Sequence, residues 1–110
     1  MRILYVDDDA KSFAIVYRQV SKYCELHWLP HVVYAHAILP LIHYDLVIVD
    51  MFGTFSEDLH EGLTRFAGDN VIMTSAVALG VGIEVPFVEK IKLKDYLMNY
   101  IKEKDKILIN

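Results

Sequence analysis

The sequence predicts an α/β fold in which helices cover both faces of a parallel five-stranded sheet. The clearest sign is the run Leu46–Asp50, whose apolar residues end in a carboxylate. Such a run is typical of a strand that is buried on both faces of a sheet. Similar runs occur at 3–6, 70–73 and 85–88, and stretches with helical spacing separate several of them. Strands that alternate with helices pair in parallel through right-handed crossovers.

The first part of the chain is predicted to form a strand, a helix and a second strand. The strand covers 2–6, and apolar residues at helical spacing predict an amphipathic helix over about 10–23. Its apolar positions are Ala10, Phe13, Ala14, Tyr17 and Val20. Asp9 is suited to cap the amino end of this helix. The second strand is expected over 24–29 and is closed by Pro30.

The middle of the chain contains the most apolar strand. Residues 32–42 show helical spacing, but Pro40 should end or kink a helix there. The third strand covers 46–50 and is followed by a loop over 51–55. A further helix is expected over 56–68, because serine and acidic residues favour its start and glycine favours its end.

The last part of the chain is predicted to complete the sheet. The fourth strand is expected over 70–74 and the fifth over 84–88. Between them, Gly80 and Gly82 leave room for only about two helical turns. The final helix is marked by a stripe formed by Leu93, Tyr96, Leu97, Tyr100 and Ile101. The tail over 102–110 could add an edge strand or pack locally. These units together predict a doubly wound, flavodoxin-like sandwich.

Length, composition and charge narrow the functional classes. The 110 residues are expected to fold as one domain over 1–110. No apolar run approaches the ~20 residues that span a bilayer, and no signal-peptide pattern is present, so we expect a cytoplasmic protein without a membrane anchor. A net charge of -4 without a basic block argues against direct nucleic-acid binding. Cys24 is the single cysteine, and the histidines lack metal-ligand spacing.

Polar side chains follow the predicted strands at their carboxyl ends. Asp7 and Asp8 follow the first strand, Asp50 ends the third, Ser75 follows the fourth, and Lys90 follows the fifth. In an open parallel sheet these ends share one edge, where such folds place their sites. Two carboxylates about 5 Å apart repel by about 3 kcal/mol at an effective dielectric near 20. A cluster of aspartates therefore requires a cation or a proton, and oxygen ligands with room for water suit Mg²⁺.

This arrangement favours phosphoryl chemistry. Asp50 could act as a nucleophile, because aspartate can form an acyl phosphate. Lys90 and Ser75 could bind the oxygens of the transferred group. Each residue also has a simpler interpretation: Asp8 could cap a helix, Asp50 could belong to a turn, and Lys90 could be a surface charge. Their joint placement at successive strand ends favours a metal and anion site.

Four motifs together resemble the receiver domain of two-component response regulators, the CheY-like superfamily. Residues 2–9 are similar to that family's first strand and acidic pair, and 44–50 to the segment that ends in the phosphoacceptor. Residues 71–76 are similar to the strand whose final Ser or Thr binds the phosphoryl group. Residues 87–90 are similar to the switch aromatic with a lysine three residues later. The resemblance covers nearly the whole chain.

The resemblance implies roles for the acidic residues. Asp50 would be the phosphoacceptor. Asp7, Asp8 and Asp50 would bind Mg²⁺, together with the backbone carbonyl oxygen of Phe52.

The resemblance also implies roles for the residues after the last two strands. Ser75 would bind the phosphoryl group, with Thr74 as the less favoured choice, and Lys90 would be the family's lysine. Ser75 and Phe87 would form the two-state switch element.

The chain departs from the family at three places. Ile91 follows Lys90 where the family has a proline in a cis peptide; without proline a cis bond costs roughly 2.5–4 kcal/mol, so a trans peptide is expected. The loop over 51–55 lacks the usual proline. The segment 75–90 is shorter than usual, so the helix before the fifth strand should be reduced or absent.

The leading hypothesis is a Mg²⁺-dependent signalling switch. A histidine kinase or phosphotransfer protein would donate a phosphoryl group to Asp50, and the product would act through contacts with a downstream protein target. Such a domain is not a conventional enzyme, since it catalyses at most its own phosphorylation and dephosphorylation. It would act alone or as one domain of a longer protein. The apolar content of 55% is compatible with a homodimer.

Two other functions remain open from the sequence. The missing proline and the short segment before the fifth strand suit a non-phosphorylated pseudo-receiver interaction module, which would bind Mg²⁺ weakly. A small phosphatase that forms an aspartyl phosphate is the third hypothesis. Such enzymes usually carry an aspartate two residues after the nucleophile, where this chain has Phe52.

Overall fold

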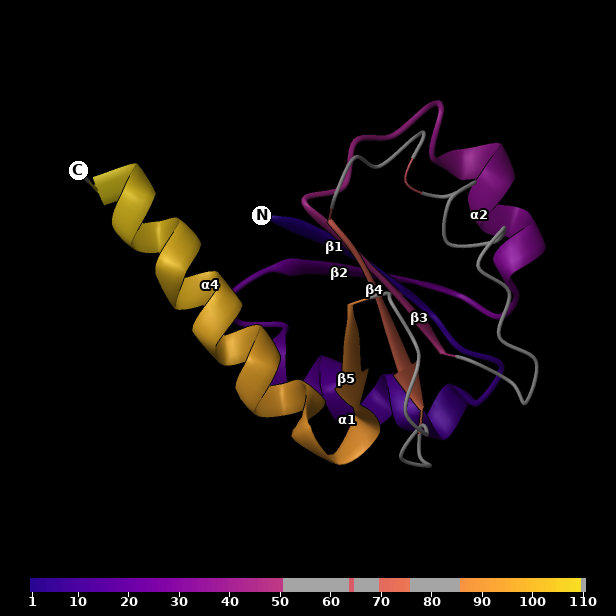
Figure 1. Ribbon diagram of the computed structural model, residues 1–110, viewed down its shortest axis with the longest axis horizontal. Helices are drawn as coiled ribbons and strands as arrows, with labels where there is room; N and C mark the ends of the chain where they lie inside the picture. Colours follow the sequence, from indigo (N-terminus) through magenta and orange to yellow (C-terminus); the bar gives the residue numbers. More distant parts are fainter. Residues whose placement is uncertain (51–63, 65–69, 76–85, 110) are drawn as a thin grey trace.

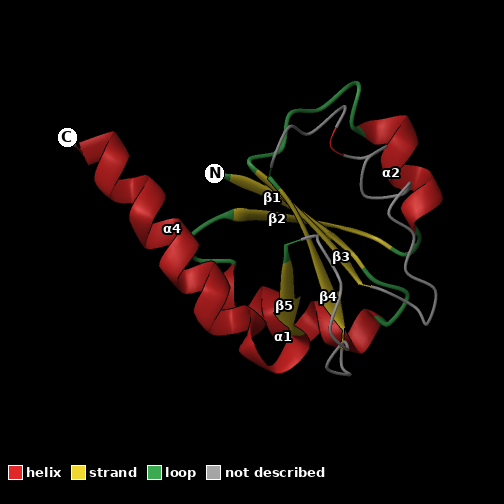
Figure 2. Cartoon of the chain, in the orientation of Figure 1, coloured by secondary structure: helices red, strands yellow, loops and turns green. Residues whose placement is uncertain are grey.

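The computed structural model of the protein contains a five-stranded parallel sheet with strand order β2-β1-β3-β4-β5. The structure describes residues 1–50, 64, 70–75 and 86–109 (Figure 1). The strands are β1 (Arg2–Val6), β2 (Glu25–Leu29), β3 (Leu46–Asp50), β4 (Val71–Ser75) and β5 (Phe87–Glu89). Their twisted arrangement is clear in Figure 2. The predicted doubly wound α/β fold of the flavodoxin-like type is confirmed.

Helices lie on both faces of the sheet. Helix α1 (Ala10–Val20) and helix α4 (Leu93–Ile109) cover one face, and helix α2 (Val32–Ile38) covers the other (Figure 1). A short 3-10 turn, η1 (Lys90–Lys92), connects β5 to α4. The right-handed crossovers that parallel strands require place helices on both sides in this way.

Two apolar layers result from the alternation of side chains along the strands. The layer beneath α1 and α4 contains Ile3, Tyr5, Val16, Val20, Leu26, Leu46, Ile48, Ile72, Leu93, Leu97 and Ile101. The layer beneath α2 contains Leu4, Val6, Ala35, Leu39, Tyr44, Val47, Val49, Val71 and Met73. Because both faces of β1, β3 and β4 are covered, these strands are almost entirely apolar. Burial of both faces is therefore the reason for the apolar runs from which the fold was predicted.

The first two helices begin and end close to their predicted positions. Asp9 caps α1, and its carboxylate accepts hydrogen bonds from the Lys11 backbone nitrogen at 3.0 Å and from Ser12 Oγ at 3.1 Å. Helix α1 ends at Val20, three residues earlier than the predicted 23. Helix α2 ends at Ile38, before Pro40, as the fixed geometry of proline requires.

The tail of the chain differs from one of its predicted forms. Helix α4 continues to Ile109, so the edge strand considered for 102–110 is wrong. No glycine or proline interrupts the sequence from Leu93 to Ile109, and its lysines and glutamate favour helix. The helix therefore runs on beyond the sheet, toward the carboxyl terminus in Figure 1.

Some predictions fall outside the described residues. These are the loop over 51–55, most of the helix over 56–68, and the reduced helix between the fourth and fifth strands. Thr64 is described and is helical. Within the described ranges, none of the helices combines the length and the apolar character needed to cross a membrane.

Candidate functional site

The carboxyl edge of the sheet gathers the aspartates that were predicted to lie at strand ends. Asp7 directly follows β1, and Asp50 is the last residue of β3. One oxygen from each of Asp7, Asp8 and Asp50 lies within 4.8 Å of the others. Asp7 is 0% exposed and Asp50 is 9% exposed, whereas Asp8 is open to solvent. The structure therefore brings two buried carboxylates and one exposed carboxylate together.

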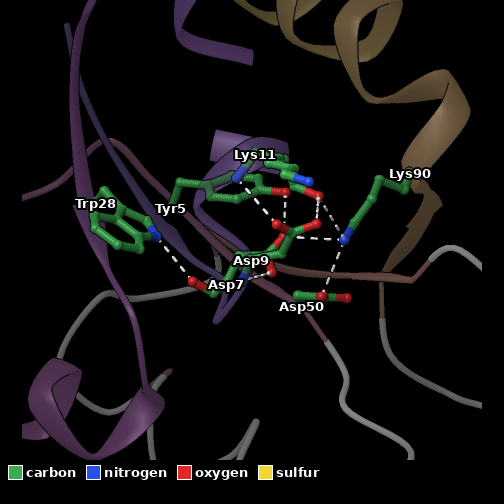
Figure 3. Close-up of polar contacts among 8 residues, drawn as sticks. Tyr5, Asp7, Asp9, Lys11, Trp28, Asp50 and Lys90 are labelled. Carbon is green, nitrogen blue, oxygen red and sulfur yellow. Dashed lines mark hydrogen bonds and ion pairs between the residues drawn. The ribbon is translucent and has the colours of Figure 1, made fainter. Parts of the chain in front are cut away.

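Lys90 lies between the two buried carboxylates (Figure 3). Its Nζ donates to Asp7 Oδ2 at 3.0 Å and to Asp50 Oδ2 at 3.1 Å. It also donates to Ser12 Oγ at 3.3 Å. The side chain reaches this position because Lys90 follows β5 directly, at the same edge of the sheet. The interpretation of Lys90 as an unpaired surface charge does not fit this geometry.

The carboxyl group of Asp50 carries a perturbed pKa. Burial disfavours its charged form and raises the pKa from 3.8 to about 6, and the neighbouring Asp7 adds to this rise while Lys90 opposes it. Burial alone would lower the pKa of Lys90, but the hydrogen bonds to Asp7 and Asp50 outweigh it and raise that pKa. Lys90 therefore stays charged, and a further cation would favour ionised Asp50.

Three donors besides Lys90 hold Asp7 in place. The Tyr5 hydroxyl donates to Asp7 Oδ2 at 2.8 Å, and the Asp9 backbone nitrogen donates to Oδ1 at 2.9 Å. The Trp28 indole Nε1 donates to the Asp7 backbone oxygen at 2.8 Å (Figure 3). Burial, followed by the bond to Asp7, raises the pKa of the Tyr5 hydroxyl, so it remains a donor. A buried carboxylate is stable only with such partners.

Tyr5 was not among the predicted site residues. The signal was present in the sequence, because residues two apart on a strand face the same side, and Tyr5 precedes Asp7 by two. Trp28 pairs in register with Tyr5 on the neighbouring strand. Its ring stacks on Phe13, with 5.5 Å between the ring centroids. This contact packs the Trp28 ring within the domain.

The residues at the end of β4 lie on different faces of the sheet. Thr74 is the register partner of Asp50, and its side chain is fully buried. Ser75 is the register partner of Glu89 and is 8% exposed. Because side chains alternate, Ser75 lies on the face of Phe87, which packs against the layer beneath α2. Phe52, the predicted source of a metal-binding carbonyl, lies outside the described residues.

The acidic group fits a magnesium ion. It supplies carboxylate oxygens from three residues, one of which is exposed and leaves room for water. Such oxygen ligands are the ones that Mg²⁺ prefers. One lysine only partly balances three carboxylates, so the group retains negative charge. The fit to Mg²⁺ rests on the carboxylate oxygens and on the negative charge that Lys90 does not balance.

No protein-family model and no curated protein sequence matches the chain. Its structure, however, is similar to solved receiver domains. The N-terminal domain of a response regulator/sensory box/GGDEF 3-domain protein from Carboxydothermus hydrogenoformans matches with a TM-score of 0.74 and 17% identity, over 99% of this chain and 96% of that chain. A CheY-like response regulator receiver domain protein from Methanospirillum hungatei matches with a TM-score of 0.70 and 16% identity, over 96% of each chain.

The response regulator domain of Thermotoga maritima CheB matches with a TM-score of 0.73 and 14% identity, over 94% of each chain. The chain has the fold of a response-regulator receiver domain. The receiver fold was the fold implied by the sequence motifs, and that prediction is confirmed. At identities this low, the structural similarity establishes the fold alone. The chemistry of the site depends on its own residues.

Proposed function

We propose that the protein is a signalling receiver domain that accepts a phosphoryl group on Asp50, with Mg²⁺ held by Asp7, Asp8 and Asp50. The observation that carries this proposal is the position of Lys90, whose Nζ bridges the Asp7 and Asp50 carboxylates. A cation beside a carboxylate at the binding edge of a receiver fold suits transfer of an anionic group to that carboxylate.

The proposed transfer forms one bond and breaks another. A carboxylate oxygen of Asp50 bonds to phosphorus while the bond from phosphorus to the donor's imidazole nitrogen breaks. The electron pair of the broken bond stays on the imidazole, which takes up a proton from water. Lys90, which is held by its bond to Asp7, positions the Asp50 carboxylate for this step. Bound Mg²⁺ would offset the charge of the carboxylates and of the incoming phosphoryl oxygens.

The proposed partners are proteins. A histidine kinase or phosphotransfer protein would donate the group, and a downstream protein would recognise the product. A cleft of about 420 Å³ opens beside Lys90, between α1 and the start of α4, and could receive a partner. Ile15 and Ile91 line it and are 56% and 88% exposed, so both side chains are open to contact with a partner.

Ser75 and Phe87 are proposed to form the switch element that reports phosphorylation. Ser75 ends β4 at the edge of the sheet that carries Asp50. Phe87 begins the neighbouring strand, on the same face as Ser75. A change at Ser75 could therefore be transmitted to Phe87 across one strand.

The test of this function is the intact mass of the protein after incubation with Mg²⁺ and acetyl phosphate. Wild type should gain one phosphoryl group, and the Asp50→Asn variant should gain none. Asp95→Asn is the matched control, because Asp95 lies exposed on α4, outside the acidic group, and this variant should react like wild type. Removal of Mg²⁺ with a chelator should abolish the gain. An unchanged mass for wild type would contradict the proposal.

One observation favours a second candidate, the non-phosphorylated interaction module. Lys90 already compensates much of the charge of Asp7 and Asp50 without a metal. A titration with Mg²⁺ separates the candidates. The phosphoacceptor should bind Mg²⁺ and react with acetyl phosphate, whereas the interaction module should bind Mg²⁺ only weakly and should not react with acetyl phosphate.

A further inference from the structure

The outer side of α2 is apolar, although it faces away from the sheet. On the inner side, Ala35 and Leu39 are buried in the layer beneath the helix. On the outer side, Val33 and Tyr34 are 58% and 53% exposed. A helix that is apolar all round is normally covered all round. The sheet covers only one side of α2, so the other side calls for a cover.

The turn after α2 extends this apolar surface. The backbone keeps turning beyond the helix, because the backbone nitrogens of Leu41 and Ile42 donate to the Ile38 oxygen at 2.9 and 3.0 Å. Residues four apart on a helix share a face, so Leu41 continues the row that Val33 and Ala37 begin. Leu41 is 83% exposed. We define the α2 surface as Val33, Tyr34, Ala37 and Leu41.

The α2 surface lies in a long stretch of the chain without formal charge. The segment 26–44 contains no Lys, Arg, Asp or Glu, so all 11 basic and 15 acidic residues lie outside it. Of the described helices, α2 alone lacks such a residue. Helix α1 carries Lys11 and Arg18, and the exposed residues of α4 include Lys94 and Asp95. The α2 surface therefore offers no charge with which a charged partner could pair.

The charge of the whole protein favours a second copy of the chain as the partner. Each copy has a net charge of -4, so two copies repel each other where their charged surfaces meet. A contact through the α2 surface brings no charged side chain of that surface against its copy. In a two-fold contact each copy presents the same surface, which must be complementary to itself. An apolar surface without charge meets this condition.

We propose that the α2 surface is a two-fold contact between two copies of the chain. Tyr34 anchors the contact, because tyrosine combines a large apolar ring with a hydroxyl that can stay in water. One short helix and its turn form a small surface, so the dimer is weak and depends on concentration. Helix α2 covers the face of the sheet opposite α1 and α4, so the dimer leaves the cleft beside Lys90 open (Figure 1). The inference goes beyond the proposed function and does not depend on it.

Sedimentation velocity of the full chain, at concentrations from about 1 µM to about 1 mM, tests the contact. Wild type should change from monomer to dimer within this range. Tyr34→Asp and Leu41→Asp should each weaken the dimer at least about tenfold, because each places like charges on both sides of the contact. Aspartate suits the first turn of a helix, where Tyr34 lies. Leu41 lies outside the helix, so Leu41→Asp decides the test if Tyr34→Asp does not fold.

Tyr23→Asp is the matched control. Tyr23 is also 53% exposed, but it lies in the turn between α1 and β2, outside the α2 surface. The substitution replaces the same residue type and adds the same charge to the protein. This variant should therefore form the dimer as wild type does.

Three outcomes would overturn the inference. A wild type that stays monomeric at the highest concentration would show that no second copy binds there, and would leave the α2 surface to a partner of another sequence. A dimer that neither α2 variant weakens would use a different surface. Equal weakening by Tyr23→Asp would trace the effect to net charge alone. The measurement contains no Mg²⁺ and no phosphodonor, so none of these outcomes bears on the phosphorylation of Asp50.

Discussion

The two edges of the sheet carry similar ionisable groups in opposite surroundings. At the amino edge, Arg2 Nε donates to Glu25 Oε2 at 2.7 Å, and both side chains are largely exposed. Its hydrogen bond to Arg2 holds the pKa of the Glu25 carboxyl below its usual value. At the carboxyl edge, burial raises the pKa of Asp50 to about 6 even though Lys90 contacts it. A carboxyl group beside a cation thus has a lowered pKa at the exposed amino edge and a raised pKa at the buried carboxyl edge.

The difference shows what burial does to an ion pair. Water stabilises the charges at the amino edge, so this pair contributes little to stability and constrains little. At the carboxyl edge, removal from water makes each charge dependent on its few partners. A buried carboxylate with a perturbed pKa is therefore the better candidate for function. If burial causes the difference between the two ion pairs, substitutions at the carboxyl edge should change the stability of the protein more than substitutions at the amino edge.

Removal of the Lys90 cation should have the largest effect. Lys90→Met leaves Asp7 and Asp50 close together without a counter-charge and should lower the free energy of unfolding by about 3 kcal/mol at pH 7. Urea denaturation measures this change. Added Mg²⁺ should restore part of the loss, because it replaces the missing positive charge. A variant as stable as wild type without Mg²⁺ would show that the carboxylates are well hydrated.

The ionisation of Asp50 should make the protein less stable as pH rises. Its folded-state pKa of about 6 lies above the ordinary 3.8, so the folded protein binds the proton more tightly than the unfolded chain. This contribution is present below about pH 4 and is lost as pH rises through 6. The shift of about two pKa units corresponds to up to ~3 kcal/mol.

Urea denaturation from pH 4 to pH 7 checks the pH prediction. The stability of wild type relative to Asp50→Asn should fall over this range, because asparagine does not ionise. Saturating Mg²⁺ should remove the fall, since the metal favours ionised Asp50. A difference between the two proteins that is independent of pH would contradict the raised pKa.

The next effect concerns two buried tyrosines, one at each edge. Tyr5 donates to the buried Asp7 carboxylate, whereas the Tyr44 hydroxyl bonds to His27 Nδ1 at 2.7 Å. Tyr5→Phe should cost about 2 kcal/mol, because its acceptor is charged, and Tyr44→Phe about 1 kcal/mol. Thermal unfolding compares the two variants. Equal losses would mean that the acceptor's charge does not matter at this site.

The smallest effect is expected at the exposed pair. Arg2→Met should leave the melting temperature close to that of wild type, because solvent already screens the contact with Glu25. It should also leave Mg²⁺ binding unchanged, since Arg2 lies at the edge opposite the acidic group. A large loss of stability in this variant would remove the contrast between the two edges.

The convergence of Asp7, Asp50 and Lys90 could be predicted from the sequence. The apolar run before each residue indicates a strand, and parallel strands place their carboxyl ends at one edge. The contacts of Tyr5 and Trp28 with Asp7 were not predicted. The Trp28 contact depends on the register between β1 and β2 and on a side-chain rotamer, which a single sequence does not specify. The Tyr5 contact was indicated by the spacing of two residues between Tyr5 and Asp7, but its rotamer was not.

The end of the chain shows another limit of the pattern. The apolar run at 107–109 suits either an edge strand or another helical turn. The structure continues the helix, because nothing in the preceding residues stops it. For Phe52 the family resemblance implied a metal-binding role for the backbone oxygen. Any residue can supply such an oxygen, so the side chain of Phe52 gave no signal.

The hydrogen bond from Trp28 to the Asp7 backbone oxygen has a practical consequence. Trp28 is the single tryptophan of the chain, and it stacks on Phe13. The protein therefore carries a built-in optical probe that is tied to the acidic group by one bond. Any ligand that moves the Asp7 backbone will change the surroundings of the indole. Its ultraviolet emission should follow events at the site in real time, without a dye.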